Sequence, residues 1–210
     1  MKLATTRRFQ DLCGRAGVAD AVSAAVIQEL MTLYSDGPRS YHNLSRIERM
    51  LGEHDACGGG PDAVEMAIWF HDAIHVPMDK LNAANSARYF TDRMGPVMEG
   101  AEIDRVVRLI FATDPASPRS GMEDEDLLID IDRSILGAPA ADYEVYRQAV
   151  RNEYAAVGDD EFAAGRRALL EGFLEEPIYA TEYFSRLERQ ARTNISGELA
   201  ALGAGGCLVG

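Results

Sequence analysis

The chain has 210 residues and a formal net charge of −13, with 47% hydrophobic and 26% charged residues. This composition is ordinary for a globular protein, and the acidic charge argues against a nucleic-acid polymer as partner, because binding many phosphates needs a basic surface. The opening MKLATTRRFQDL has no apolar run, and no stretch approaches the roughly 18 apolar residues of a membrane span. Three scattered cysteines without CxxC spacing predict reduced thiols. We therefore expect a cytoplasmic protein without a membrane segment.

Apolar residues recur at helical spacing along most of the chain, and Gly and Pro separate the runs. The most apolar run contains AVEMAIWF, and Pro61 before it suits a first helical position. No clear period-2 run predicts a strand. We expect about eight or nine helices, within residues 18–34, 41–51, 61–74, 85–94, 99–113, 124–136, 140–157, 159–175 and 181–202.

The predicted fold class is all-α. No internal repeat and no long linker divides the chain, so we expect one domain over residues 1–210, with a core over about 18–202. The tail GAGGCLVG is expected to fray. The last predicted helix is amphipathic, and its apolar stripe is a candidate homodimer contact.

The stretch IWFHDAIH places two of the four histidines and an aspartate beside the most apolar run. A buried His71–Asp72 pair is costly unless a metal ion or a hydrogen bond compensates it, and both readings stay open. His42 and one of Asp130 and Asp132 are further candidates for a metal site. Imidazole and carboxylate ligands suit Mn, Fe, Co, Ni or Zn. The two aspartates point about 200° apart on a helix, so only one of them faces the core.

Five blocks in order resemble the HD superfamily of metal-dependent phosphohydrolases, in its branch of unassigned substrate: YHNLSRI, AIWFHDAIH, NAANSARYF, IDIDRSILG and YRQAVRNEYAAV. The likeness runs from about residue 41 to 194 and implies a single-domain helical bundle of the HD type. The superfamily signature H…HD…D implies four ligands of a divalent ion (Mn, Fe, Co, Ni, Zn or Mg): His42, His71, Asp72 and Asp132. Asp132 is preferred to Asp130 because related enzymes place a basic residue after the ligand, as Arg133 stands here.

The resemblance implies hydrolysis of a small phosphomonoester or nucleotide by a metal-activated water. Asp72 would act as ligand and as base or hydrogen-bond partner of the water. His75 would protonate the leaving oxygen, and the fork of Arg133 would bind a phosphate oxygen. The structural alternatives are a helix-end histidine for His75 and a surface salt bridge for Arg133.

Departures from the branch keep other interpretations open. Arg46 stands where a second histidine is usual, Ala83 and Ala84 replace two glutamates, and Asp114 stands where a histidine is frequent. These losses suit a catalytically degenerate metal-binding or structural protein. An HD-fold iron oxygenase is the third interpretation, and it needs more histidines than this chain offers. We expect His54, in GEHDACGGG, to lie on the surface without a role.

Overall fold

The computed structural model describes residues 2–37 and 39–204. Over these residues the chain forms eleven α-helices, one 3₁₀ helix and no strand, which confirms the all-α prediction. None of the helices in the described part is both long and apolar enough to cross a membrane. Of the tail expected to fray, Gly203 and Ala204 close the last helix, and residues 205–210 lie outside the described residues.

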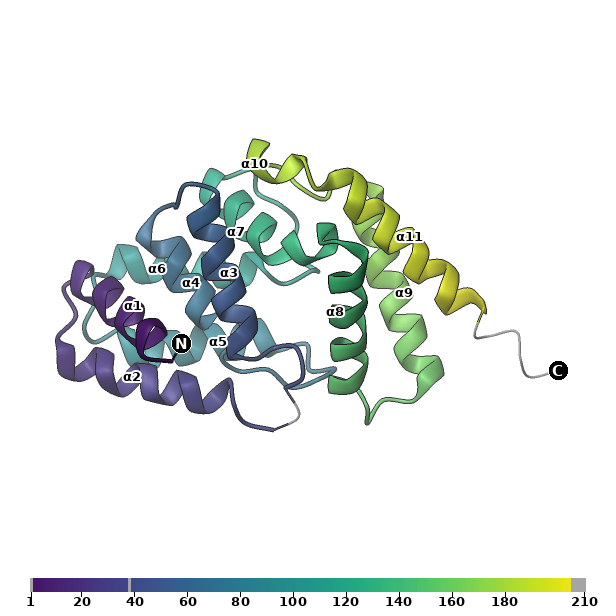
Figure 1. Ribbon diagram of the computed structural model, residues 1–210. Coiled ribbons are helices and arrows are strands. Elements are labelled where there is room, and N and C mark those ends of the chain that lie inside the picture. Colours follow the sequence, from purple (N-terminus) through teal and green to yellow (C-terminus); the bar gives the residue numbers. More distant parts are fainter. Residues whose placement is uncertain (1, 38, 205–210) are drawn as a thin grey trace. The chain divides into compact units, whose positions relative to one another are not determined.

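The contacts between residues divide the chain into two compact units, residues 1–128 (unit 1) and residues 129–210 (unit 2). The single-domain organisation stays a prediction. Unit 1 holds α1 (Lys2–Arg15), α2 (Asp20–Leu33), α3 (Leu44–Ala56), α4 (Asp62–Phe70), α5 (Asn82–Met94) and α6 (Gly100–Ala112), and α7 (Glu123–Arg133) contains the boundary. Unit 2 continues with η1 (Ser134–Gly137), α8 (Ala140–Glu153), α9 (Asp159–Glu175), α10 (Glu182–Ser185) and α11 (Glu188–Ala204) (Figure 1).

Three differences from the predicted helices change the helix count or the site. Helix α1 was not expected, and the run predicted over 181–202 divides into α10 and α11. These two differences raise the helix count above the predicted eight or nine. Helix α4 ends at Phe70 rather than at Ile74, so HDAIH forms a turn after the helix. This early end matters because it frees the side chains of the turn from helical spacing.

Helix α4 forms the centre of unit 1. It contacts α1, α3, α5 and α6, and all eight residues from 63 to 70 are buried. A helix that is apolar on every side is stable only inside a core, as its sequence indicates. Its last aromatic residues pack edge to face, Trp69 against Phe9 at 5.3 Å and Phe70 against Phe90 at 5.0 Å. This packing fixes the position from which the following turn starts.

Unit 2 is built around α11, which contacts η1 and α9. The Asn194 amide donates to the carbonyl oxygens of Leu136 and Ala138, each at 2.8 Å. The buried Arg166 guanidinium donates to Glu198, with Nε 2.9 Å from Oε1. Gly137 approaches the chain before α11 so closely that an added Cβ would lie 2.5 Å from Cβ of Leu187.

Candidate metal centre

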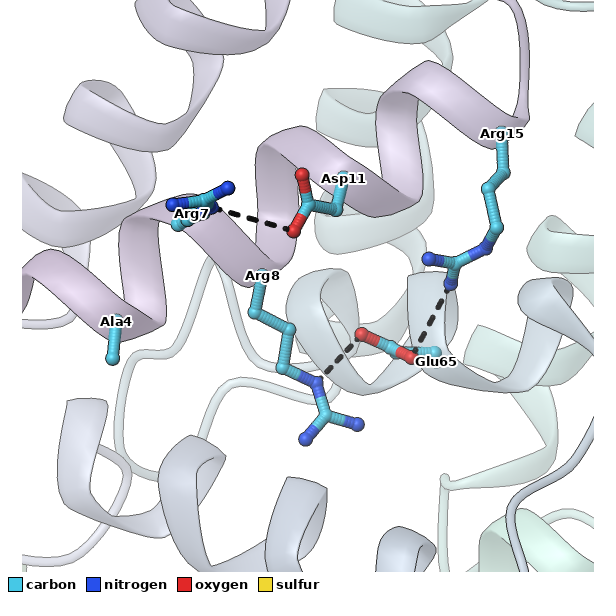
Figure 2. A pocket seen from close by; sticks show the side chains of 6 residues that line it. All are labelled: Ala4, Arg7, Arg8, Asp11, Arg15 and Glu65. Carbon is cyan, nitrogen blue, oxygen red and sulfur yellow. Dashed lines mark hydrogen bonds and ion pairs between the residues drawn. The ribbon is translucent and has the colours of Figure 1, made fainter.

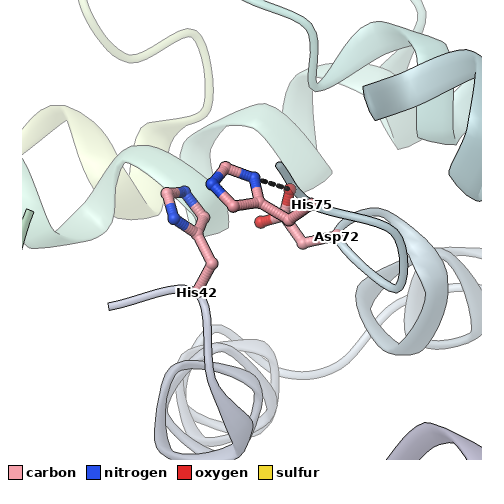
Figure 3. Close-up of side chains that lie close together, drawn as sticks. All are labelled: His42, Asp72 and His75. Atoms are coloured by element: carbon pink, nitrogen blue, oxygen red, sulfur yellow. Dashed lines mark ion pairs between the residues drawn. The ribbon is translucent and has the colours of Figure 1, made fainter. Parts of the chain in front are cut away.

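Three side chains of unit 1 form a cluster suited to a metal ion: His42, Asp72 and His75 (Figure 3). Each offers one nitrogen or oxygen atom, and these atoms all lie within 4.8 Å of one another. The two imidazole rings stack with centroids 3.8 Å apart, and Nδ1 of His75 lies 4.0 Å from Oδ1 of Asp72. Two imidazoles and a carboxylate are a donor set that fits a first-row divalent metal.

Local structure brings the cluster together. His42 directly precedes Asn43, whose side chain caps α3 by accepting from the backbone N–H groups of Ser45 and Arg46. Asp72 and His75 lie in the turn after α4, three positions apart. The cap and the helix end therefore present ligand-bearing residues from two segments about thirty positions apart in the chain.

The Arg39 guanidinium joins these two segments. Its Nη1 donates to the carbonyl oxygens of His42 at 3.1 Å and Asp72 at 2.8 Å, and its Nη2 donates to Ala73 at 2.9 Å. It also lies over the ring of Tyr34, 5.3 Å from the centroid. Arg39 therefore fixes the backbone of two residues of the cluster without using their side chains.

Helix α5 holds the other end of the turn. The Ser86 hydroxyl accepts from the N–H of Ile74 and lies 3.1 Å from its carbonyl oxygen. The Asn82 side chain pairs with both backbone groups of Val76 at 2.9 Å. Because these contacts occupy the backbone on both sides of His75, the turn is fixed by side chains and does not continue α4.

His71 is buried beside the cluster, 2% exposed. Its Nδ1 lies 3.0 Å from the carbonyl oxygen of Ile68, a contact that requires the proton on Nδ1 because a carbonyl only accepts. Nε2 then faces Oδ2 of Asp72 at 2.9 Å. Two acceptor atoms so close need a cation, which can be a proton, an arginine or a metal ion. A backbone bond from the far ring nitrogen is also the usual way in which a ligand histidine is oriented.

Arg46 lies beside the contact between His71 and Asp72. Its Nη2 is 3.3 Å from both Oδ2 of Asp72 and Nε2 of His71. Burial acts to raise the pKa of the Asp72 carboxyl, but the neighbouring positive charges, first that of His71, hold this pKa well below its usual range. Asp72 is therefore an anion that its surroundings compensate.

The remaining predicted residues belong to unit 2. Asp130 is fully buried and accepts hydrogen bonds from the backbone of Ala180 and from the N–H and hydroxyl of Thr181, the last two at 2.7 Å. Asp132 is half-buried, so of the two aspartates Asp130 faces the core, as their spacing predicts for one of them. The guanidinium of Arg133 lies over the Phe173 ring at 4.6 Å. The ligand role of Asp132 and the phosphate role of Arg133 stay predictions.

The prediction that His54 lies on the surface is wrong, because its exposure is only 4%. Helix α3 continues past Leu51 to Ala56, and His54 follows Met50 by four positions on the buried face. Gly60 fits closely against its Nε2. Burial lowers the pKa of the His54 imidazole, and the nearby Glu65 carboxylate offsets only part of this effect.

A hollow of about 450 Å³ beside α1 is lined by three arginines but is not a second anion site (Figure 2). Arg8 donates to the buried Glu65 at 2.8 Å and also pairs with Asp55. Arg15 pairs with Asp62 at 2.8 Å. Acidic partners neutralise these charges, so the hollow marks where ion pairs attach α1 to α4.

Comparison with protein-family models, curated proteins and solved structures finds no match for this chain. The site therefore rests on its own residues. Sequence reasoning missed the positioning residues Arg39, Asn82 and Ser86. Arg39 donates a hydrogen bond to the carbonyl oxygen of Asp72, 33 positions away, and no sequence motif predicts this contact.

Proposed function

We propose that the chain is a metal-dependent phosphohydrolase of the HD superfamily that acts on a small phosphomonoester or nucleotide. The observation that carries the proposal is the cluster of His42, Asp72 and His75, with His71 oriented beside it by Ile68. The five sequence blocks that resemble the superfamily support the same reading.

His42, His71 and Asp72 would hold the metal ion, as the resemblance implies. When bound, a divalent ion supplies a Lewis acid and lowers the pKa of a bound water. The Asp72 carboxylate would orient the attacking water by accepting a hydrogen bond. His75, whose ring stacks on that of His42, would hold a proton for the leaving oxygen, the role that the resemblance implies. Arg133 keeps its predicted role of binding a phosphate oxygen.

Metal content and turnover of the purified full chain test the proposal. We expect close to one equivalent of a transition metal by plasma mass spectrometry, lost in His42→Ala, and manganese-stimulated release of phosphate from a nucleotide panel. A chain that neither contains nor takes up a divalent metal would refute the proposal. Arg88→Gln is the matched control, since the Arg88 side chain is 81% exposed on α5 and pairs with Asp92 one turn along that helix.

A metal-free binding or structural protein is the second candidate. The contacts of Arg46 with Asp72 and His71 favour it, because they supply a cation where two acceptor atoms meet. This candidate predicts a chain that takes up no divalent metal and shows no phosphate release with any added metal.

A further inference from the structure

We infer that Arg46 is an internal cation that competes with the metal ion for Asp72 and His71 and so sets how tightly this site binds metal. The inference rests on the proposed function and adds a regulatory property to it. The site would load only when free metal is plentiful, and it would remain compensated when metal leaves.

The geometry carries the first step. Nη2 of Arg46, Nε2 of His71 and Oδ2 of Asp72 form a triangle with sides of 3.3, 3.3 and 2.9 Å. The guanidinium nitrogen thus lies within 3.3 Å of both acceptor atoms. These two atoms are also the ones through which an imidazole and a carboxylate bind a metal.

The surroundings hold Arg46 in this position. Its side chain is only 8% exposed, and the guanidinium lies 4.7 Å from the centroid of the Tyr41 ring. Its backbone N–H is fixed in the first turn of α3 by the side chain of Asn43. An arginine stacked on an aromatic ring and restrained at its backbone returns to the same place whenever the site is free of metal.

Electrostatics then couples Arg46 to metal affinity. A guanidinium stays protonated at any physiological pH, so it cannot escape repulsion from a divalent ion by losing its proton. Charges a few ångströms apart in a buried site are weakly screened. A bound metal must therefore either tolerate Arg46 beside it or displace it from Tyr41. Both outcomes weaken metal binding relative to a neutral residue at position 46.

Titration calorimetry with manganese, on full-length protein stripped by chelator, measures the effect. Arg46→Gln is expected to bind manganese about tenfold more tightly than the natural chain, which corresponds to about 1.4 kcal/mol. Arg46→Lys keeps the charge and should stay within about threefold of the natural chain. Arg88→Gln removes the same charge from an exposed position on α5 and should stay within about twofold.

The outcomes separate this inference from the proposed function. Tighter binding by Arg46→Gln, with the affinities of Arg46→Lys and Arg88→Gln close to that of the natural chain, supports it. If Arg46→Gln and the natural chain bind manganese equally and His42→Ala does not bind it, the inference is overturned and the proposed function stands. No binding by any variant overturns both. If Arg46→Gln does not fold, a tenfold tightening in Arg46→Lys overturns the charge argument.

Discussion

Replacing Asp130 by Asn should destabilise unit 2, because the Asp130 carboxylate is a buried acceptor with several donors. Its Oδ2 accepts from the N–H of Ala180 at 3.0 Å and from the N–H and hydroxyl of Thr181 at 2.7 Å. The residue is 0% exposed, so no water replaces a lost partner. These bonds hold the segment before α10 against α7.

The magnitude follows from the number and kind of these bonds. A hydrogen bond to a charged group contributes about 1.5–3 kcal/mol. Asparagine keeps one carbonyl oxygen but loses the charge, and its amide would face backbone N–H groups. We therefore expect the loss of one to two such bonds, about 2–4 kcal/mol in the free energy of unfolding. A chain of this length would then melt about 4–16 °C lower.

Urea and thermal denaturation followed by circular dichroism measure this loss. Asp132→Asn is the matched control, since Asp132 is half-buried on the same helix and should cost less stability. For metal affinity the resemblance predicts the opposite ranking of the two variants. Asp132→Asn should bind metal more weakly, and Asp130→Asn should retain binding. A change below about 0.5 kcal/mol for Asp130→Asn would refute the reasoning. Loss of metal in that variant, at normal stability, would make Asp130 the ligand.

Three further predictions concern stability. Gly137→Ala should cost about 1–3 kcal/mol because its Cβ has no room, whereas Gly197→Ala, with open space in α11, should gain about 0.5–1 kcal/mol in the same urea titration. Because the pKa of His54 is lowered in the folded chain, the unfolded chain binds a proton below about pH 6.5 that the folded chain excludes. The free energy of unfolding should therefore fall as the pH drops from about 6.5 to the folded-state pKa of His54. His54→Gln should flatten that part of the stability–pH profile. Arg39→Gln should lower the urea midpoint and reduce manganese affinity, and unchanged affinity would show that Arg39 does not position the cluster.

The elements that could be predicted are those whose signal is local. The apolar letters AVEMAIWF indicate a buried helix, and α4 is the centre of unit 1. The end of α4 could not be predicted because it depends on Asn82 and Ser86, which hold the backbone of the following turn. Helix α1 was missed because the opening of the chain has no apolar run, and its Arg8 pairs with residues far along the chain. These partners, Asp55 and Glu65, lie 47 and 57 positions away from Arg8.

The residues of the site, like the helices, could be predicted only where their signal is local. The sequence identified His42, Asp72 and His75 as residues of the site. It predicted that His75 donates a proton, whereas the structure places a ring nitrogen of His75 among the atoms that could hold the ion. His54 was misjudged because polar neighbours masked its spacing from Met50, which the periodicity of α3 alone would have revealed. Long-range contacts such as those of Arg39 leave no periodic or motif signal.

The buried pair at the end of α4 needs positive charge, and the chain supplies a permanent source of it in Arg46. A site that depended on metal alone would leave Asp72 with only a proton on His71 to compensate it whenever the ion dissociated, and a poorly compensated anion away from water destabilises a fold. With Arg46 in place, folding and metal binding become separable properties. Removing Arg46 should therefore couple them, so that manganese raises the melting temperature of Arg46→Gln more than that of the natural chain.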